Sequence, residues 1–355
     1  MSRPAEPSLP ASRFTGHELP ISTTVSAGPA TSAGATAPAG AANSSGAGSP
    51  SGHRSRSGLI KISAAGLLWG TTGVVVQLLH RTSTLSPVGI GFYRLAIAAA
   101  VLLAVCRPRA ISAAFRVAPI GLILTGIGLG AYQALYFIAV TLGGVSVATV
   151  VGLGLAPVLL AAGEAVRARR LPDRTTAATL VTGVLGLLLI TGSAGRATDG
   201  APHPLLGLLA ATACGVCYAI STVISRRQMQ RIDATTLTVV SAGVGALALA
   251  PLAVIGPMAG VAVPLRPGPA LMLAYLGVVT TAVAYALFYA GLRTTAGSTA
   301  AVLTLLEPLV AALLAMLILG ESLSGSALVG ATLLLTAVAM LYAAPTMPRQ
   351  AEPRP

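Results

Sequence analysis

Ten apolar segments, each long enough to cross a lipid bilayer, constrain this chain more than any other feature of its sequence. The hydrocarbon core of a bilayer is about 30 Å thick, and a helix that rises 1.5 Å per residue needs about 20 residues to span it. Within that core every backbone N–H and C=O must be paired inside its own segment, so the segments are predicted to be helices. The predicted spans cover residues 59–79, 86–106, 117–140, 145–163, 175–192, 204–225, 235–257, 269–291, 298–318 and 324–343.

The scarcity of charge supports a location in the membrane. Charged residues make up 9% of the chain and hydrophobic residues 54%, whereas soluble domains carry about 25% charged residues because their surfaces face water. The formal net charge of +13 would suit a nucleic-acid partner only if the basic residues gathered on one solvated face. They fall instead in short clusters between the apolar segments. We therefore predict an all-α membrane protein that is surrounded by the lipid bilayer and has no nucleic-acid partner.

The arginines are distributed unevenly between the predicted loops. Cytoplasmic loops carry an excess of Lys and Arg, and placing the N-terminus inside leaves only Arg81, Arg196 and Arg266 in outer loops. We therefore expect a multi-pass protein of the cell (inner) membrane with both termini in the cytoplasm. The arginines predicted to lie inside are Arg107, Arg109, Arg116, Arg167, Arg169, Arg170, Arg174, Arg226, Arg227, Arg231, Arg293, Arg349 and Arg354.

The chain divides into two halves and two tails. Residues 1–57 are rich in Ala, Gly, Ser, Pro and Thr and lack a sustained apolar run, so a disordered cytoplasmic tail is predicted there. Residues 58–192 and 204–343 each hold five predicted spans, and residues 344–355 form a short cytoplasmic tail. Because five is odd, the second half must be inverted relative to the first, an architecture that is common among transporters.

Two prolines lie at matching places in the two halves. Pro157 aligns with Pro308, and Phe137 with Phe288, at one shared offset along the chain. A proline inside a helix removes one backbone donor and frees the carbonyl four residues earlier, which for Pro308 is that of Thr304. Irregular backbone at membrane depth is tolerated where it is buried in protein or lines a wet cavity. Both prolines are therefore predicted to have a structural role, as the bends of two related helices.

Two charged residues, Arg94 and Glu307, fall near the middle of the second and ninth predicted spans. A charge at that depth costs about 2.5–3.5 kcal/mol on insertion scales, so it is usually paired or faces a water-filled cavity. Two interpretations follow. The residues form either a structural pair between helices or a polar site at which at least one of them meets substrate or a coupling proton. Arg94, Glu307 and the neighbouring Thr304 are predicted substrate-binding residues on the second interpretation.

Aromatic residues make up only 4% of the chain, so their positions are informative. Tyr132 and Tyr136 lie one helical turn apart in the third span, and Tyr285 and Tyr289 repeat that spacing in the eighth. Trp69 and Tyr285 lie too deep for the aromatic belts at membrane interfaces. Cavity lining and ordinary packing explain each residue equally well. The predicted substrate contacts in this group, with one adjacent amide, are Trp69, Gln133, Tyr136, Tyr218, Tyr285 and Tyr289.

The sequence offers little for catalysis or metal binding. It holds no HExxH motif, no nucleophilic serine motif within a span and no phosphate-binding loop. Cys214 and Cys217 lie three residues apart on one predicted helix, but no second pair and no nearby His accompany them. They are predicted to be packing residues. We therefore expect no enzymatic activity, no catalytic residue, no cofactor and no metal.

Several short motifs occur in a characteristic order along the chain. They are Leu67-Leu68-Trp69-Gly70, Ser86-Pro87, Phe92-Tyr93-Arg94, Tyr218-Ala219, Ser225-Arg226-Arg227, Leu306-Glu307-Pro308 and Leu319-Gly320-Glu321. Over about residues 59–343 the sequence resembles the EamA family of the drug/metabolite transporter (DMT) superfamily. The resemblance implies ten helices in an inverted repeat, a central cavity, and export or uptake of amino acids, sugars or other metabolites. The first half departs from it, because Ala156 stands where Glu307 would repeat.

These observations predict a secondary transporter that moves a small polar metabolite by alternating access. The predicted partners are an amino acid or a related small molecule, moved by efflux, and a proton as the candidate coupling ion, with the carboxylate of Glu307 as its carrier. Two alternatives stay open. A non-transporting membrane scaffold or sensor would have a closed core without a polar cavity. A lipid-linked sugar flippase of the same superfamily would have a lateral opening with basic residues at the level of the head groups.

Overall fold

The computed structural model describes residues 50–193, 202–255, 266–319 and 324–343. The predicted tail residues 1–49 and 344–355, together with Arg196 and the Gly320-Glu321 motif, lie outside the described residues. The described elements are all helices: α1 (Pro50–Gly70), α2 (Thr72–Thr82), α3 (Pro87–Val105), α4 (Pro108–Val117), α5 (Pro119–Gly143), α6 (Val145–Ala168), α7 (Arg174–Ser193), α8 (Pro204–Gln228), α9 (Ala234–Val254), α10 (Pro267–Gly277), the π-helix η1 (Val278–Val283), α11 (Ala284–Leu292), α12 (Gly297–Thr304), α13 (Leu306–Leu319) and α14 (Gly325–Ala343).

Ten stretches of these described residues are long and apolar enough to cross a membrane, which confirms the predicted fold class. Some spans consist of a single helix, while others join two or three elements end to end. The first span joins α1 and α2, the eighth joins α10, η1 and α11, and the ninth joins α12 and α13. The other seven spans are α3, α5, α6, α7, α8, α9 and α14.

The first helix begins earlier than the sequence pattern indicated. α1 starts at Pro50, so residues 50–57, which were predicted to belong to a disordered tail, are helical. Once a helix is nucleated in the apolar segment, each further residue adds one hydrogen bond, and extension beyond the membrane edge is inexpensive. The predicted boundary at residue 57 is therefore wrong by about two turns.

A short helix that the apolar pattern did not indicate lies between the second and third spans. In α4 the side chains of Arg109 and Arg116 are exposed while Ala114 is buried against the core. Proline stands in the first turn of both α4 and α5, where its missing N–H costs nothing because that group has no partner inside the helix. An amphipathic helix of this kind suits the membrane interface.

Two spans have irregular backbone at depth. In the eighth, η1 replaces regular α-helix, and the hydroxyl groups of Thr280 and Thr281 both donate to the carbonyl oxygen of Leu276 at 2.8 Å. In the ninth, the helix breaks at Leu305 between α12 and α13, three residues before Pro308. The fourth span, predicted to be the counterpart of the ninth, is not broken. Its helix α6 runs through Pro157 without interruption.

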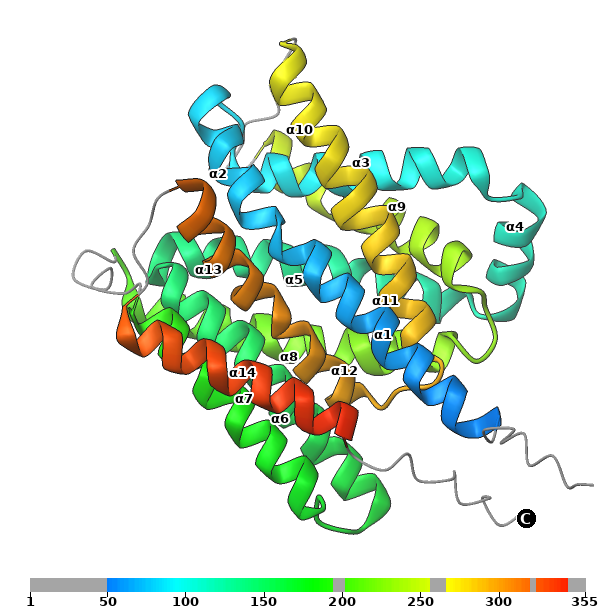
Figure 1. Ribbon diagram of the computed structural model, residues 1–355. Coiled ribbons are helices and arrows are strands. Elements are labelled where there is room, and N and C mark those ends of the chain that lie inside the picture. The colour runs from blue at the N-terminus through cyan, green and yellow to red at the C-terminus, as the bar shows by residue number, and fades with distance from the viewer. Residues whose placement is uncertain (1–49, 194–201, 256–265, 320–323, 344–355) are drawn as a thin grey trace, which may run out of the picture. The chain divides into compact units, whose positions relative to one another are not determined.

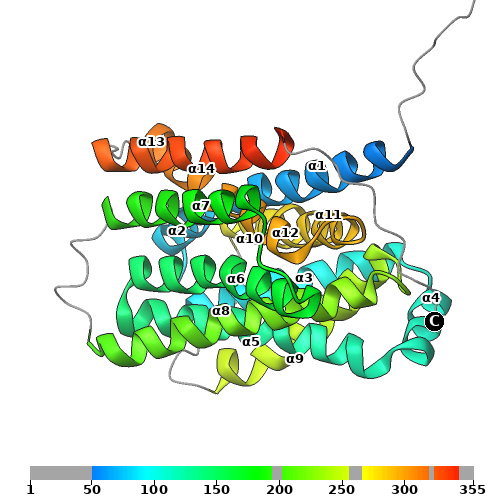
Figure 2. The ribbon, with the colours of Figure 1, turned by 90° about the horizontal axis from the view of Figure 1, so that it is seen from below.

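The packing of the spans follows the symmetry expected of two related halves. The first span packs on the eighth through α1 and α11. The sixth span packs on the third in the equivalent way, through α8 and α5. The second and seventh spans (α3, α9), the fourth and ninth (α6, α12) and the fifth and tenth (α7, α14) pair with each other. Figures 1 and 2 both show α7 and α14 side by side. Exchanging the two halves leaves this set of neighbours unchanged, in agreement with two inverted five-helix repeats.

Glycines allow the two equivalent crossings to be close. A Cβ on Gly207 of α8 would collide with the backbone of Gly143 of α5, and a Cβ on Gly291 of α11 would lie 2.9 Å from the carbonyl oxygen of Gly58 of α1. Small residues at such crossings let backbones approach in lipid, where no hydrophobic force drives helices together.

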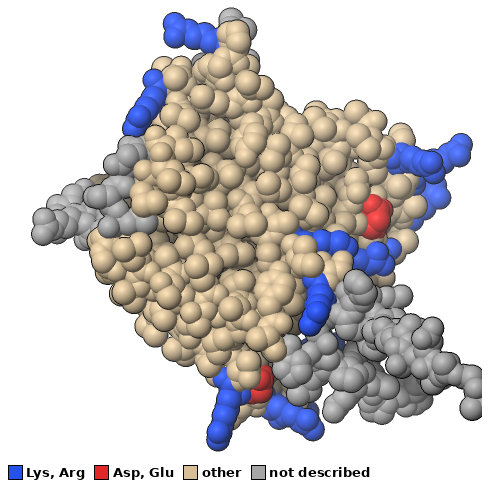
Figure 3. All heavy atoms as spheres, viewed as in Figure 1, with Lys and Arg blue, Asp and Glu red and all other residues tan. Residues whose placement is uncertain are grey.

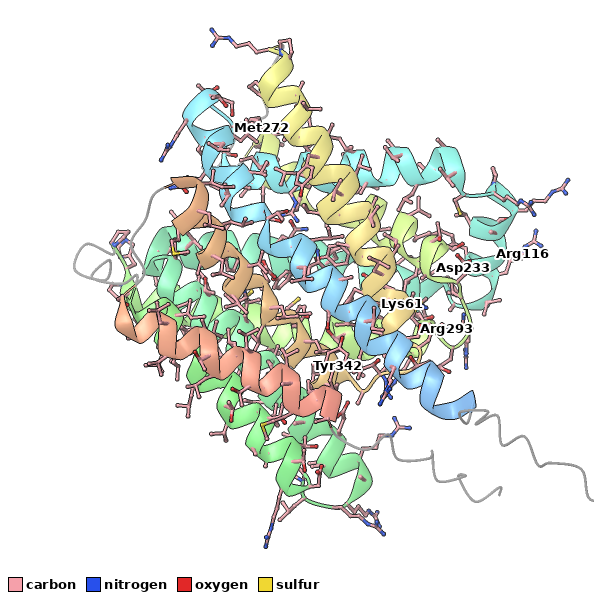
Figure 4. The ribbon with its side chains drawn as sticks, viewed as in Figure 1. Lys61, Arg116, Asp233, Met272, Arg293 and Tyr342 are labelled. Carbon is pink, nitrogen blue, oxygen red and sulfur yellow. The ribbon has the colours of Figure 1, made fainter. Side chains whose placement is uncertain are left out.

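The described arginines gather at one end of the bundle. Because successive spans alternate in direction, one end holds Arg107, Arg109, Arg116, Arg167, Arg169, Arg170, Arg174, Arg226, Arg227, Arg231 and Arg293, and we call it the arginine-rich end. The opposite end holds Arg81 and Arg266. Figure 4 shows Arg116, Asp233 and Arg293 toward the first end and Met272 toward the second. Between the ends, Figure 3 shows a broad uncharged surface of the kind that suits lipid.

Candidate functional site

A cavity of about 490 Å³ lies within the bundle. This volume is in the range of sites for small molecules. Residues from both halves line it, on α1, α2, α3, α5, α6, α7, α8, α11, α12, α13 and α14. Its charged lining residues are Arg94 and Glu307, and much of the remaining wall is aromatic or small and apolar.

Arg94 reaches the cavity from the middle of α3. Its Nε donates a hydrogen bond to the hydroxyl oxygen of Thr281 at 3.3 Å. Thr281 belongs to η1, so the irregular turn of the eighth span supports the guanidinium group. π-helical turns occur frequently at functional sites because they redirect the side chains around them.

Glu307 reaches the cavity from the first turn of α13, directly after the break at Leu305. Arg94 and Glu307 are near enough for their charges to interact. Within the described part of the chain, however, the two side chains form no direct ion pair and no hydrogen bond with each other. The two opposite charges thus share a cavity with space between them, where water or a ligand that carries both charges can bridge them.

Aromatic rings form much of the wall near these charges. The ring centroids of Trp69 and Tyr285 are 4.9 Å apart, and those of Tyr132 and Tyr218 are 5.2 Å apart. The Tyr218 hydroxyl lies 3.4 Å from that of Thr304. Thr304 ends α12, so this contact joins the aromatic wall to the broken helix that carries Glu307.

Most of the predicted substrate-binding residues meet in this cavity, although they come from six different spans. Those that line it are Trp69, Arg94, Gln133, Tyr136, Tyr218, Tyr285, Thr304 and Glu307, together with Pro308.

Tyr289 and Pro157 lie outside the cavity lining. Tyr289 is buried toward the arginine-rich end, where its hydroxyl donates to the hydroxyl of Ser241 at 3.4 Å. Tyr289 therefore stays a predicted substrate contact that is not part of the cavity lining in this conformation. The spacing of Tyr285 and Tyr289 places both side chains on one helix face. Tyr289 lies about one turn closer to the arginine-rich end, however, beyond the residues that line the cavity.

Three buried polar atoms in the cavity wall have no hydrogen-bond partner among the described residues. They are Nε1 of Trp69, Oγ1 of Thr72 and Oε1 of Gln133. Leaving a buried polar group unpaired costs about 1–3 kcal/mol. Such groups are retained where another molecule or another conformation satisfies them.

Several polar lining residues were not among those predicted from the sequence. Tyr132 was visible one turn before Tyr136, and Thr72 lies nearly one turn after Trp69, so helical spacing could have indicated both. Thr149 accepts or donates a hydrogen bond with the Tyr136 hydroxyl at 3.1 Å. No signal in the sequence marks Thr149, because threonine occurs in most of the spans.

The cavity extends toward one end only. From the level of Arg94 and Glu307 its lining continues to Val76, Val145 and Ala327, near the opposite end of the bundle. None of its lining residues comes from the helix turns nearest the arginine-rich end. Within the described ranges, no group of three or more His, Cys, Asp or Glu residues is placed to hold a metal ion.

Comparison with known proteins agrees with this architecture. The chain is 32% identical over 290 residues, covering 81% of it and 94% of the relative, to the uncharacterized transporter YwfM of Bacillus subtilis (strain 168). It is 26% identical over 305 residues, covering 81% of it and 95% of the relative, to the uncharacterized inner membrane transporter YicL of Salmonella typhimurium. A solved crystal structure with 22% sequence identity matches the fold with a TM-score of 0.68 over 80% of this chain and 96% of that one.

A family match covers nearly all of the described helices. The EamA-like transporter family matches twice, over residues 56–192 and 205–343, once for each five-helix half. The chain is a membrane protein of ten spans and belongs to the EamA-like transporter family.

Proposed function

We propose that this protein exports a small zwitterionic metabolite of the amino-acid class across the cell membrane, in exchange for a proton carried by Glu307. The observation that carries the proposal is the pair of opposite charges in one cavity without a direct ion pair. A zwitterion brings a carboxylate for the guanidinium of Arg94 and an ammonium group for the carboxylate of Glu307. It thereby neutralises both charges at a depth where isolated charges are unfavourable.

The aromatic wall supports a ligand with an apolar part. Trp69 and Tyr285 present ring surface beside the charged groups. The unpaired Nε1 of Trp69 and Oε1 of Gln133 offer one donor and one acceptor for further polar atoms of the ligand. Sites for small molecules commonly combine such apolar walls with a few polar groups that fix orientation.

Glu307 can couple the substrate to a proton because its carboxylate holds one positive charge at a time. With the cavity facing the outside, protonation of Glu307 removes the counter-charge of the ammonium group and releases the substrate. With the cavity facing the cytoplasm, the proton leaves and the ammonium group of a new substrate takes its place. An inward proton gradient then drives export, and each state binds either the proton or the substrate at this carboxylate.

The direction rests on the arginine-rich end being cytoplasmic, as the positive-inside rule predicts. The cavity then faces the outside in this conformation. The two alternative functions fit less well. A scaffold has no need of a cavity of about 490 Å³ that is lined by two opposite charges. Among the described lining residues, Arg94 is the one basic side chain that the cavity offers to a sugar-lipid diphosphate.

Transport by purified protein in proteoliposomes tests the proposal. Neutral amino acids should drive proton movement, whereas the matching amines without the carboxylate and the matching acids without the ammonium group should not. Glu307→Gln should insert normally and lose proton-coupled transport. Asp233→Asn, which changes a carboxylate that caps α9 outside the cavity, is the matched control and should retain transport. If the unaltered protein transported an amine, coupled to protons, as fast as the amino acid, the proposal of a zwitterionic substrate would be refuted.

A further inference from the structure

A second carboxylate, Glu164, joins the two halves at the arginine-rich end. It lies near the C-terminal end of α6, in the first half, and accepts hydrogen bonds from the first turn of α12, in the second half. The backbone N–H of Gly297 donates to its Oε1 at 2.8 Å and that of Ser298 at 3.3 Å, while the Ser298 hydroxyl donates to its Oε2. Hydrogen bonds to an ionised acceptor are about twice as strong as neutral ones.

The connection that precedes α12 is held at the same end by Arg226 of α8 and by Gln230 in the turn that follows α8. Arg226 donates from Nε to the carbonyl oxygen of Thr295 at 3.0 Å, and the side-chain amide of Gln230 donates to that of Arg293 at 3.4 Å. Figure 4 shows Arg293 near the end marked by Arg116 and Asp233. Bonds from the fourth and sixth spans thus fix the start of the ninth, where the cavity lining is absent.

The residue at the equivalent place at the other end of the cavity has no carboxylate. At the offset that aligns Pro157 with Pro308, Glu164 corresponds to Ala315, and Ala296, the residue before α12, corresponds to Val145. Both Ala315 and Val145 line the cavity. One end is therefore closed where a carboxylate is present, and the equivalent position at the other end is open where alanine stands.

Resting on the transport proposed above, we propose that Glu164 is a positioning residue that latches the arginine-rich end shut and so holds the cavity toward the opposite end. The latch acts through α12, which leads from Gly297 to the break beside Glu307. Alternating access in inverted repeats moves one repeat against the other around a fixed site. Opening the arginine-rich end therefore requires α12 to leave α6 and the bonds to Glu164 to break.

Cysteine accessibility in lipid nanodiscs tests the latch without substrate or a proton gradient. Cys106, Cys214 and Cys217 are first replaced by alanine in a version that elutes as a single species. The closed end is probed by Ala301→Cys, since Ala301 is 1% exposed and packs with Leu160 of α6. The cavity is probed by Ala312→Cys, since Ala312 lines it.

Glu164→Ala should raise the labelling rate of Ala301→Cys by at least about tenfold, the lower end of the effect of losing one charge-assisted hydrogen bond, while the labelling of Ala312→Cys does not rise. Asp233→Ala is the matched control, because Asp233 accepts from the backbone N–H of Thr236 at 2.8 Å within a single helix. It should leave the Ala301→Cys rate within about twofold, since it removes only a local cap. Equal rises at both reporters indicate simple destabilisation and overturn the latch, as does an unchanged rate at Ala301→Cys.

Two further variants keep the test decisive if Glu164→Ala does not accumulate. Glu164→Gln keeps one acceptor and should give a smaller rise at Ala301→Cys. Ala315→Glu keeps Glu164 and offers a competing carboxylate to the start of α6, so it should raise the same rate, and no rise in either variant overturns the latch. Since no transport is measured, failure of the latch leaves the proposed function standing, and failure of amino-acid transport leaves the latch standing.

Discussion

A double-mutant cycle on Arg94 and Glu307 separates a substrate site from a structural ion pair. Within the described part of the chain, the side chain of Arg94 forms one hydrogen bond, to Thr281 at 3.3 Å. That bond to a neutral acceptor contributes about 1 kcal/mol. Glu307 forms no direct ion pair with Arg94. Arg94→Gln should therefore lower the free energy of unfolding by about 1 kcal/mol, and Glu307→Gln should lower it by no more.

The interaction free energy between the two substitutions distinguishes a substrate site from a structural ion pair. Without substrate, the effects of the two substitutions should add, with an interaction free energy below about 1 kcal/mol. Breaking one partner of a direct buried ion pair would instead cost about 3–5 kcal/mol, which the double substitution would largely restore. The measurement is the free energy of unfolding in mixed micelles titrated with SDS, for the unaltered protein, both single variants and the double variant.

The binding affinity of the same variants for an amino acid is a second, independent measurement. Each single substitution should weaken amino-acid binding by about 10- to 150-fold, because a charge-assisted hydrogen bond contributes about 1.5–3 kcal/mol. Arg94→Gln should leave the weak binding of the matching amine unchanged, since the amine has no carboxylate for Arg94 to bind. A coupling energy of 3 kcal/mol or more in the absence of substrate, with equal losses for the amine and the amino acid, would refute the reasoning.

Two further predictions concern the architecture. A reporter fused after Arg170 should be active as a cytoplasmic reporter and one fused after Gly200 as an external reporter. The reverse pattern would mean that the cavity faces the cytoplasm in this conformation, which contradicts the proposed orientation. Gly207→Ala places a Cβ against the backbone of Gly143 and should cost about 1–3 kcal/mol of stability, measured by SDS unfolding. Gly192→Ala, whose Cβ meets nothing within 4 Å, should be neutral or slightly stabilising because alanine favours helix, and equal losses in both variants would contradict the packing argument.

The spans and their order were predictable because lipid imposes one simple requirement on sequence. About 20 apolar residues must follow one another wherever the chain crosses, and loops between them must carry the charge. The interruptions were less accessible. Pro308 indicated irregular backbone in the ninth span, whereas η1 is accompanied only by two threonine hydroxyl groups that donate to the carbonyl oxygen of Leu276. Threonine occurs in most spans without this effect, so its presence alone predicts nothing.

The site was partly predictable because charge at depth is expensive and therefore informative. Arg94 and Glu307 were identified from depth alone, and both line the cavity. Tyr289 shows the limit of that reasoning, since residues four apart share a helix face but differ in depth by about 6 Å. Thr149 shows another, because its position beside the Tyr136 hydroxyl depends on how α5 and α6 pack.

The two halves have the same arrangement of helices, but different side chains stand at equivalent positions. On the proposed mechanism, this difference affects the transport cycle. At the shared offset, Glu307 corresponds to Ala156, which is fully buried, and Arg94 corresponds to Gly245. Each half supplies one of the two cavity charges, so neither half can bind a zwitterion by itself. Glu164 adds a contact at one end that its counterpart Ala315 cannot make. On the proposed mechanism, the symmetric packing gives access to two conformations, and these residues without a counterpart in the other half determine which conformation the empty protein occupies and which carboxylate exchanges the proton.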